Sequence, residues 1–260
     1  MLMYPFELQF TPGHRQVLLV ELCGQDELKV VGYGTADAIH LLNGMIGREQ
    51  SLQAGAIATA DRDRLLAAVY RQTYGARIES TIHCRYCNAL FDVVFSLDDL
   101  LLHTQPETDK STLIQTAEGW YQTAEGHSFR LPTGDDELAV SGLPVDEAVQ
   151  MLLARCTATG TISGNTTGVQ HAMEKVAPLL QKEMLAHCPE CSKEQQVSFD
   201  MQSFLLARLK HDQRMVTLEV HQLAMAYHWS HQEILRLPRS LRRTYAAFIE
   251  AATDTQPVFK

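Results

Sequence analysis

Apolar residues recur at two different periods along this chain, and the change of period separates strand-like from helix-like regions. Within the first 33 residues they alternate over 7–10 and run together over 17–22, with a Pro-Gly pair between the two stretches. This arrangement predicts a β-hairpin. Apolar positions then recur at steps of three and four over 35–44 and 59–74, so two helices are expected to follow.

Strand-like and helix-like patterns alternate again in the middle of the chain. The stretches 78–83 and 90–95 are rich in β-branched and aromatic residues, and they predict a second hairpin. A helical pattern over 168–185 precedes a short strand-like stretch at 195–199. The two regions are expected to face each other although they lie far apart in the sequence.

The region between these two parts has a regular pattern of its own. Residues 119–131 predict another hairpin, and acidic residues at Asp135 and Asp146 favour the N-termini of two helices. The C-terminal third is helical in pattern almost throughout. There Ser230 and Glu233 form a capping box, and Pro238 ends the helix that it starts.

Together these elements predict an α+β fold: an N-terminal β-hairpin and helices, a split ribbon with an inserted α/β subdomain, and an all-helical C-terminus. The predicted boundaries are 1–76 for the N-terminal module, 77–200 for the split ribbon with its halves at 77–97 and 183–200, 98–182 for the insert, and 201–260 for a C-terminal docking segment.

Four of the six cysteines stand in two CxxC pairs, which are Cys84 with Cys87 and Cys188 with Cys191. Four thiolates complete the tetrahedral shell of a structural zinc ion and leave no position open for water. The pairs lie 100 residues apart, whereas an ordinary zinc ribbon separates them by roughly 15–20 residues. The sequence therefore predicts one zinc ion held by a ribbon that an inserted subdomain splits.

Two alternatives at this site stay open. A lone CxxC pair is also typical of redox proteins, although that chemistry needs a βαβ context that neither pair has here. His83 and His187 directly precede the two pairs and are alternative ligands. Cys23 and Cys156 belong to no motif, and we interpret them as small buried apolar residues.

Charge and composition narrow the classes of function. A net charge of −9 and a pI near 5.6 argue against a general nucleic-acid-binding protein. No run of 18 or more apolar residues predicts a membrane span, and the N-terminus lacks the pattern of a secretory signal, so a cytosolic protein is expected. The sequence contains no GxSxG, HExxH, GxxxxGK[ST] or strand-linked GxGxxG motif, so no enzyme is predicted.

The C-terminal segment departs from this acidic balance. From Arg208 to Arg243 there are seven Lys or Arg residues and three acidic residues. This charge predicts contact with an acidic partner surface, and a solvated helix face is the alternative. The candidate partner-binding residues combine aromatic, apolar and basic side chains: Tyr227, Trp229, Leu235, Arg239, Arg242 and Arg243.

Several strings of the chain carry a resemblance to a known family. They are FRLPTGDDEL at 129–138, CPEC at 188–191 with FDMQSFL at 199–205, EVHQLAMAYHWS at 219–230, EILRLP at 233–238 and RRTY at 242–245. The last three together are the most specific. Over roughly residues 75–252 the chain resembles the T-even phage-type baseplate hub family of contractile tails and tail-like injection systems, whose members are sometimes labelled baseplate hub assembly chaperones.

The resemblance implies a structural role without catalysis, in a hetero-oligomeric assembly with other baseplate and tail-tube or hub proteins. It implies a protein made in the cytoplasm of the host or producer cell and then built into the tail baseplate of a virion or injection particle. An assembly chaperone that is absent from the mature particle is the first alternative. A zinc-ribbon nucleic-acid-binding protein is the second. It would need exposed basic and aromatic residues around the cysteine pairs, and only Arg85, Tyr86 and Lys193 fit that requirement.

Overall fold

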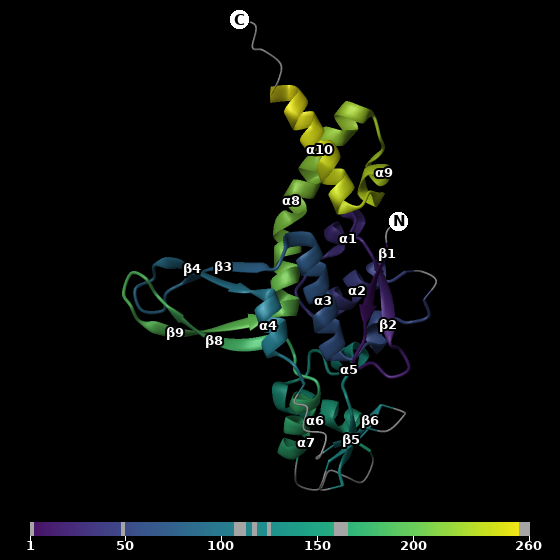
Figure 1. Cartoon of the computed structure of the whole chain (residues 1–260), viewed down its shortest axis with the longest axis vertical. Coiled ribbons are helices and arrows are strands. Elements are labelled where there is room, and N and C mark those ends of the chain that lie inside the picture. Colours follow the sequence, from purple (N-terminus) through teal and green to yellow (C-terminus); the bar gives the residue numbers. More distant parts are fainter. Residues whose placement is uncertain are drawn as a thin grey trace, which may run out of the picture.

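The protein is elongated, and a central body carries three extensions (Figure 1). Two hairpins project side by side from the body, a lobe formed by the insert lies at one end, and a helical arm lies at the other. The computed structural model describes residues 3–47, 50–106, 113–115, 119–123, 126–158 and 166–254. Helices and short antiparallel hairpins make up these residues, so the fold is mixed α and β.

The central body contains the N-terminal hairpin and the helices that follow it. Its elements are β1 (Met3–Glu7), β2 (Gln16–Val20), α1 (Gly24–Lys29), α2 (Thr35–Met45), the 3-10 turn η1 (Ala54–Ala56) and α3 (Thr59–Tyr74). The predicted hairpin and both predicted helices are present. Helix α1 corrects the expectation of β structure up to residue 33. It begins because Cys23 caps it and the Asp26 carboxylate accepts hydrogen bonds from the Cys23 amide and thiol.

The two projecting hairpins come from the two halves of the predicted ribbon. They are β3 (Arg77–His83) with β4 (Leu90–Ser96), and β8 (Gln181–His187) with β9 (Glu194–Asp200). The predicted helix over 168–185 is wrong beyond Val176, because 181–187 form a strand. Pro178 cannot continue the helix, and pairing with β9 then outweighs the helix propensity of Leu185 and Ala186.

Most of the insert forms the lobe below the body in Figure 1, whereas its first helix, α4 (Leu97–His103), lies beside the body at the bases of the hairpins. The other elements are β5 (Leu113–Gln115), β6 (Trp120–Thr123), β7 (Ser128–Arg130), α5 (Gly134–Ala139), α6 (Val145–Cys156) and α7 (Thr166–Val176). The predicted hairpin is present as β6 and β7, with β5 on its outer edge. Thr133 and Asp136 form a capping box that starts α5, so the acidic residues act as predicted.

The C-terminal arm consists of α8 (Met201–Tyr227), α9 (His231–Arg236) and α10 (Arg239–Asp254). The predicted capping box is present, since Ser230 accepts from the Glu233 amide and the Glu233 carboxylate accepts from Ser230. Helix α8 is long enough to join two regions. Its first half packs into the body through Leu205 and Leu209, and its second half packs against α9 and α10. Across the described residues, no helix combines the length and hydropathy needed to cross a membrane.

The main hydrophobic core connects the predicted segments. It contains residues of the N-terminal module together with Ile78 and Leu97 from one hairpin region and Leu180 and Phe199 from the other. The bases of both hairpins are therefore fixed in one core, whereas their far ends project beyond it (Figure 1).

Buried charged side chains in the N-terminal half of α3 connect it to the N-terminal hairpin region, the insert and the segment before β8. Asp61 accepts hydrogen bonds from the amides of residues 9–11, and Arg62 pairs with Glu137 of the insert at 2.5 Å. Asp63 accepts from the Leu180 amide at 3.1 Å, just before β8. Arg64 donates to three carbonyl oxygens, those of residues 60, 104 and 178. Two of these four consecutive residues, Asp63 and Arg64, thus position the chain segments that bound the insert.

Candidate functional site

The two projecting hairpins are two copies of one unit. Every position of the first unit lies 104 residues before its counterpart, as Cys84 lies before Cys188. In each unit a 7-residue strand, a CxxC turn, a second 7-residue strand and a capped helix follow in the same order. The matched positions share residues beyond the cysteines: Glu79 and Glu183, His83 and His187, Val93 and Val197, Phe95 and Phe199, Leu101 and Leu205, Leu102 and Leu206.

The matched backbone contacts are also the same. Residue 97 donates its amide to the carbonyl of residue 76 at 2.8 Å, and residue 201 donates to residue 180 at 3.1 Å. Residues 88 and 192 both adopt positive φ, at 61° and 56°, directly after the second cysteine of each pair. The repeated unit therefore extends well beyond the two cysteine pairs, and a comparison of the chain with itself at this offset detects it.

The four cysteines meet at the ends of the hairpins that lie far from the body. Their sulfur atoms all lie within 4.8 Å of one another. The Sγ atoms of Cys84 and Cys191 are 3.6 Å apart, and those of Cys87 and Cys188 are 3.7 Å apart. Cys84 matches Cys188, and Cys87 matches Cys191. Swapping the two hairpins therefore converts one of these sulfur pairs into the other, as in a local two-fold arrangement. Phe95 and Phe199, which are matched positions, likewise contact each other, with ring centroids 5.0 Å apart.

The sulfur spacing fits a tetrahedral metal site. Four sulfurs at about 2.3 Å from a central zinc lie about 3.8 Å from one another, close to both measured distances. A disulfide would bring two sulfurs to about 2 Å. The predicted ligand set, which is Cys84, Cys87, Cys188 and Cys191, is thus brought together in a geometry compatible with metal binding.

The thiols of this cluster differ in acidity. The backbone amides of Cys87 and Tyr86 hydrogen-bond the Cys84 sulfur and lower its pKa to about 6, although burial opposes this. The Ala89 amide lowers the pKa of Cys87, but burial and hydrogen bonds to the other three cysteines together raise it to about 12. The Cys84 thiolate thus forms readily, whereas a second thiolate at Cys87, beside it, is disfavoured. A divalent cation removes this conflict, because it stabilises every coordinating thiolate.

The hairpin ends have little other support. A small cluster of buried residues lies between them: Phe91, Ala186 and the two buried cysteines, Cys84 and Cys188. Lys193 also lies over the ring of Tyr86, with its Nζ 4.9 Å from the ring centroid. Such a small core stabilises weakly, so the four sulfurs are the main device available to hold the two ends together.

His83 and His187 are both exposed and are not part of the sulfur cluster. His187 instead pairs with Glu194 at 2.7 Å on the outer surface of its hairpin. The ring of His83 lies 3.5 Å from the carbonyl oxygen of Asn88. Neither histidine is placed as a ligand.

Gln195 is a site residue that the sequence analysis missed. It comes from the second hairpin and is buried, and its amide oxygen accepts from the Arg85 amide at 2.8 Å. Its amide nitrogen donates to the His83 carbonyl at 3.1 Å. Both bonds hold the backbone on either side of Cys84. The matched position in the first hairpin is Phe91, so the hydrogen bonds of Gln195 have no counterpart there. Comparing the two repeated units therefore does not reveal the role of Gln195.

We expect Gln195→Ala to reduce the free energy of unfolding by about 1 kcal/mol. The change removes two hydrogen bonds to the backbone around Cys84 and leaves a small void between the hairpins. Urea denaturation checks this. Gln196→Ala, at an exposed position next to it, is the matched control and should leave stability unchanged. Equal stability of both variants would show that the bridge does not contribute.

The structure places three of the predicted partner-binding residues inside the protein. Arg239 and Arg242 are 4% and 0% exposed, and Leu235 is 7% exposed. Arg242 pairs with Glu27 and, at 2.6 Å, with Glu219. The prediction that these three side chains contact a partner is therefore corrected.

Arg239 and Arg242 are buried because they belong to an ion network that joins the arm to the body. Arg239 pairs with Glu27 of α1 and, at 2.6 Å, with Asp212 of α8. The Tyr74 hydroxyl also donates to Asp212, at 3.0 Å. Beside these pairs Arg243 lies 3.5 Å from Glu219, so three arginines face three carboxylates. Basic residues that the sequence pattern assigned to a surface instead neutralise buried acids.

The other three candidates are at least partly accessible. Tyr227 is 37% exposed, Trp229 is half-buried, and the side chain of Arg243 is 48% exposed. Tyr227 stacks on Trp229 with ring centroids 5.0 Å apart, and Trp229 meets Tyr245 edge-on. The aromatic pair thus stabilises the end of the arm and still presents one surface to solvent.

The two remaining cysteines lie outside the cluster. Cys156 is buried, as predicted, and burial raises the pKa of its thiol to about 11. Cys23 is half-buried, and burial followed by its hydrogen bond to Asp26 raises its pKa to about 11 as well. Neither thiol is activated for attack on a disulfide.

Comparison with protein-family models, curated proteins and solved structures finds no match to this chain. Its function is therefore inferred from its own residues, and the four-sulfur cluster is the feature with the most specific chemistry.

Proposed function

We propose that this protein is a structural component of a contractile-tail baseplate, held in shape by one structural zinc ion. The observation that carries the structural role is the sulfur cluster. All four ligands come from the protein, and Cys84 and Cys188 are buried, so the site is arranged to join two hairpins rather than to expose a metal to substrate. The zinc ion would fasten the two ends that the main core does not reach.

The baseplate assignment rests on the resemblance over roughly residues 75–252 to the T-even phage-type hub family. Two of its strings have clear structural roles in this chain. The TGDDEL string forms the capping box of α5, and the RRTY string supplies Arg242 to the buried ion network. Both strings therefore stabilise local structure in this chain. The particle and its neighbouring subunits remain part of the proposal.

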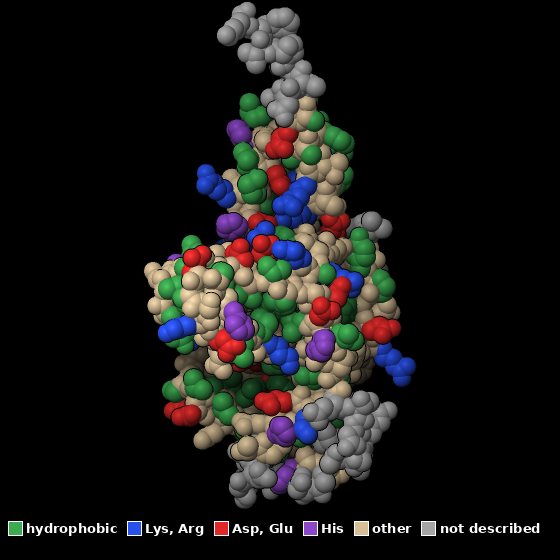
Figure 2. Space-filling model, turned by 60° about the vertical axis from the view of Figure 1, so that its left-hand side comes forward, with side chains coloured by type: hydrophobic (Ala, Val, Ile, Leu, Met, Phe, Trp, Pro, Cys, Tyr) green, Lys and Arg blue, Asp and Glu red, His purple; other side chains and the backbone are tan. Residues whose placement is uncertain are grey.

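The C-terminal arm is the surface that we propose for docking. Exposed basic residues on its helices outnumber exposed acidic ones. The exposed basic residues are Arg208, Lys210, Arg214, Arg236 and Arg243, and the exposed acidic residues within 201–252 are Glu233 and Glu250. The upper part of Figure 2 shows hydrophobic side chains between basic and histidine side chains on this arm.

Exposed apolar residues on the arm add to this surface. They are Met215, Leu218, Met225, Leu241 and Phe248, which are between 40% and 68% exposed. Large apolar side chains bordered by positive charge favour an acidic partner with an apolar face. We propose that another baseplate or hub subunit is that partner.

Purified tail particles test this assignment. We expect mass spectrometry to detect the chain at a fixed ratio to the other baseplate proteins, and deletion of its gene to stop baseplate assembly. Absence from the particle together with failed assembly would instead identify an assembly chaperone. Absence from the particle with normal assembly would overturn both roles.

A further inference from the structure

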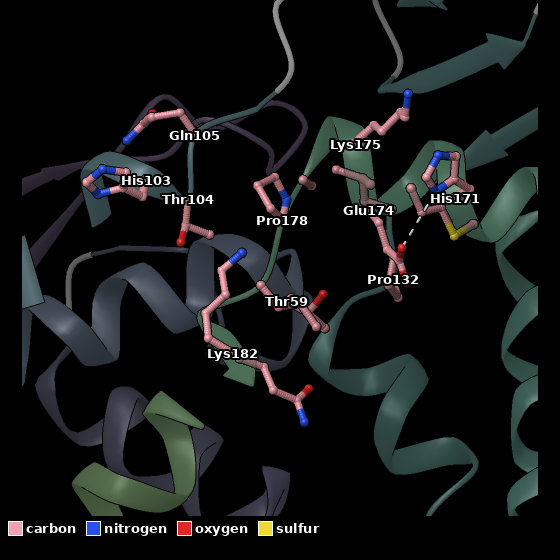
Figure 3. Close-up of a pocket in the computed structure, with 15 residues that line it drawn as sticks. Thr59, His103, Thr104, Gln105, Pro132, His171, Glu174, Lys175, Pro178 and Lys182 are labelled. Carbon is pink, nitrogen blue, oxygen red and sulfur yellow. Dashed lines mark ion pairs between the residues drawn. The ribbon is translucent and has the colours of Figure 1, made fainter. Parts of the chain in front are cut away.

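A cavity of about 610 Å³ lies where the insert meets the bases of the hairpins, far from the sulfur cluster. Figure 3 shows its walls. The end of α4 with Thr104 forms one side, α7 with His171 and Glu174 forms the opposite side, and Thr59, Pro178 and Lys182 lie between them. A volume of this size is typical of pockets for small molecules, which range from about 300 to 1,000 Å³.

The polar groups of this cavity favour a negative charge. Lys182 extends into the space beside Thr104 (Figure 3), and no carboxylate among the described residues lies within ion-pair distance of it. The acid on the opposite wall, Glu174, is 3.9 Å from His171. Within the described part of the chain, the Lys182 ammonium group is thus available to a negatively charged ligand.

Thr104 provides the second observation. Thr104 is 1% exposed, and its Oγ1 atom has no hydrogen-bond partner among the residues that the structure describes. A buried hydroxyl without a partner costs free energy, and such groups in native structures call for an explanation. A ligand oxygen in the cavity would accept the missing hydrogen bond.

Hydrogen bonds to buried residues of α3 hold the backbone near Thr104 and Lys182 in place. Arg64 donates to the Thr104 carbonyl at 2.8 Å and to the Pro178 carbonyl at 3.1 Å, so one buried guanidinium fixes two neighbouring parts of the cavity wall. Asp63 holds the Leu180 amide two residues before Lys182. The cavity is therefore largely formed before any ligand binds, which lowers the entropy cost of binding.

We propose that this cavity binds a small organic anion, with a carboxylate or phosphate group carried on an apolar body. Lys182 pairs with the charged group, and the Thr104 hydroxyl donates to one of its oxygens. The apolar side chains that line the cavity contact the body of the ligand: Leu131, Met173, Ala177 and Leu179. This site is independent of the metal cluster and of the docking arm.

Three probes of related shape test the proposal: phenyl phosphate, benzoate and the neutral benzyl alcohol. Binding is followed through the methyl signals of methionines labelled with ¹³C, because Met173 lines the cavity. We expect at least one of the two anions to shift the Met173 signal in a saturable manner and to bind about tenfold or more tightly than benzyl alcohol. The stronger of the two anions identifies the preferred headgroup.

Two variants locate the binding groups. Lys182→Gln should weaken binding of the anion about tenfold, whereas Lys29→Gln, an exposed lysine of the body, should leave it unchanged. Thr104→Val should also weaken binding by several-fold. Because the Thr104 hydroxyl has no partner within the described part of the chain, this variant should melt no lower than wild type without ligand, which separates a binding role from a structural one.

The proposal is overturned if neither anion shifts the Met173 signal, if benzyl alcohol binds as tightly as the anions, or if Lys182→Gln binds like wild type. None of these results bears on the baseplate role, which the particle composition tests separately.

Discussion

Cys188→Ser is expected to abolish metal binding and to separate the ends of the two hairpins. Elemental analysis of the wild-type protein should give about one zinc per chain, and the variant should retain almost none. Structural zinc contributes on the order of 10 kcal/mol or more in small metal-bound peptides, and here the small cluster around Phe91 and Ala186 has little with which to replace it. We expect hydrogen exchange to become fast along β3, β4, β8 and β9.

The body should survive this change, because the bases of both hairpins belong to the main core. Cys23→Ser is the matched control. It also removes one thiol, but serine still donates to Asp26 and caps α1, so both zinc content and stability should be retained. A wild-type protein without zinc, whose clustered thiols react freely, would contradict the structural metal site and favour a redox role.

Arg242→Met is expected to lower the free energy of unfolding by about 3–5 kcal/mol. The Arg242 side chain is fully buried between Glu27 and Glu219, and methionine would leave part of that negative charge without its partner. The arm should loosen first, because the network joins α10 to α1 and α8. Urea denaturation gives the loss of stability, and hydrogen exchange in α9 and α10 shows where it occurs.

Arg243→Met is the control at the adjacent position. Its guanidinium lies 3.5 Å from Glu219 and is 48% exposed, so solvent screens the interaction and a loss below about 1 kcal/mol is expected. Equal losses in the two variants would show that burial does not distinguish these arginines. The control also probes docking, since Arg243 remains a candidate contact of the arm whereas Arg242 does not.

Local features of the fold were predictable where a short sequence motif is enough to specify the structure. The capping box at Ser230 and the Pro-Gly turn of the first hairpin depend on residues a few positions apart. The cysteine pairs were equally clear, because two CxxC motifs in one chain have few other uses. The strand at 181–187 was missed because its residues favour a helix, and only β9 supplies the pairing that makes it a strand.

The arginine network in the C-terminal segment also depends on contacts between residues far apart in the sequence, which local patterns do not reveal. Arg239, Arg242 and Arg243 look alike in the sequence, but Glu27 lies more than 200 residues from the first two, as its pairs with both show. No local pattern connects these residues. The charged residues at the start of α3 are similar, since they contact four parts of the chain that lie far from them in the sequence.

The sequence by itself determined the two cysteine pairs as candidate metal ligands, most of the helices and hairpins, and the order in which they follow, because each depends on side-chain chemistry or on contacts between near neighbours. The tertiary structure alone decided which charges are buried, that Gln195 bridges the hairpins, and that Lys182 and Thr104 share a cavity. Those outcomes depend on which distant segments meet, and burial then changes the free energy of the same side chain by several kcal/mol.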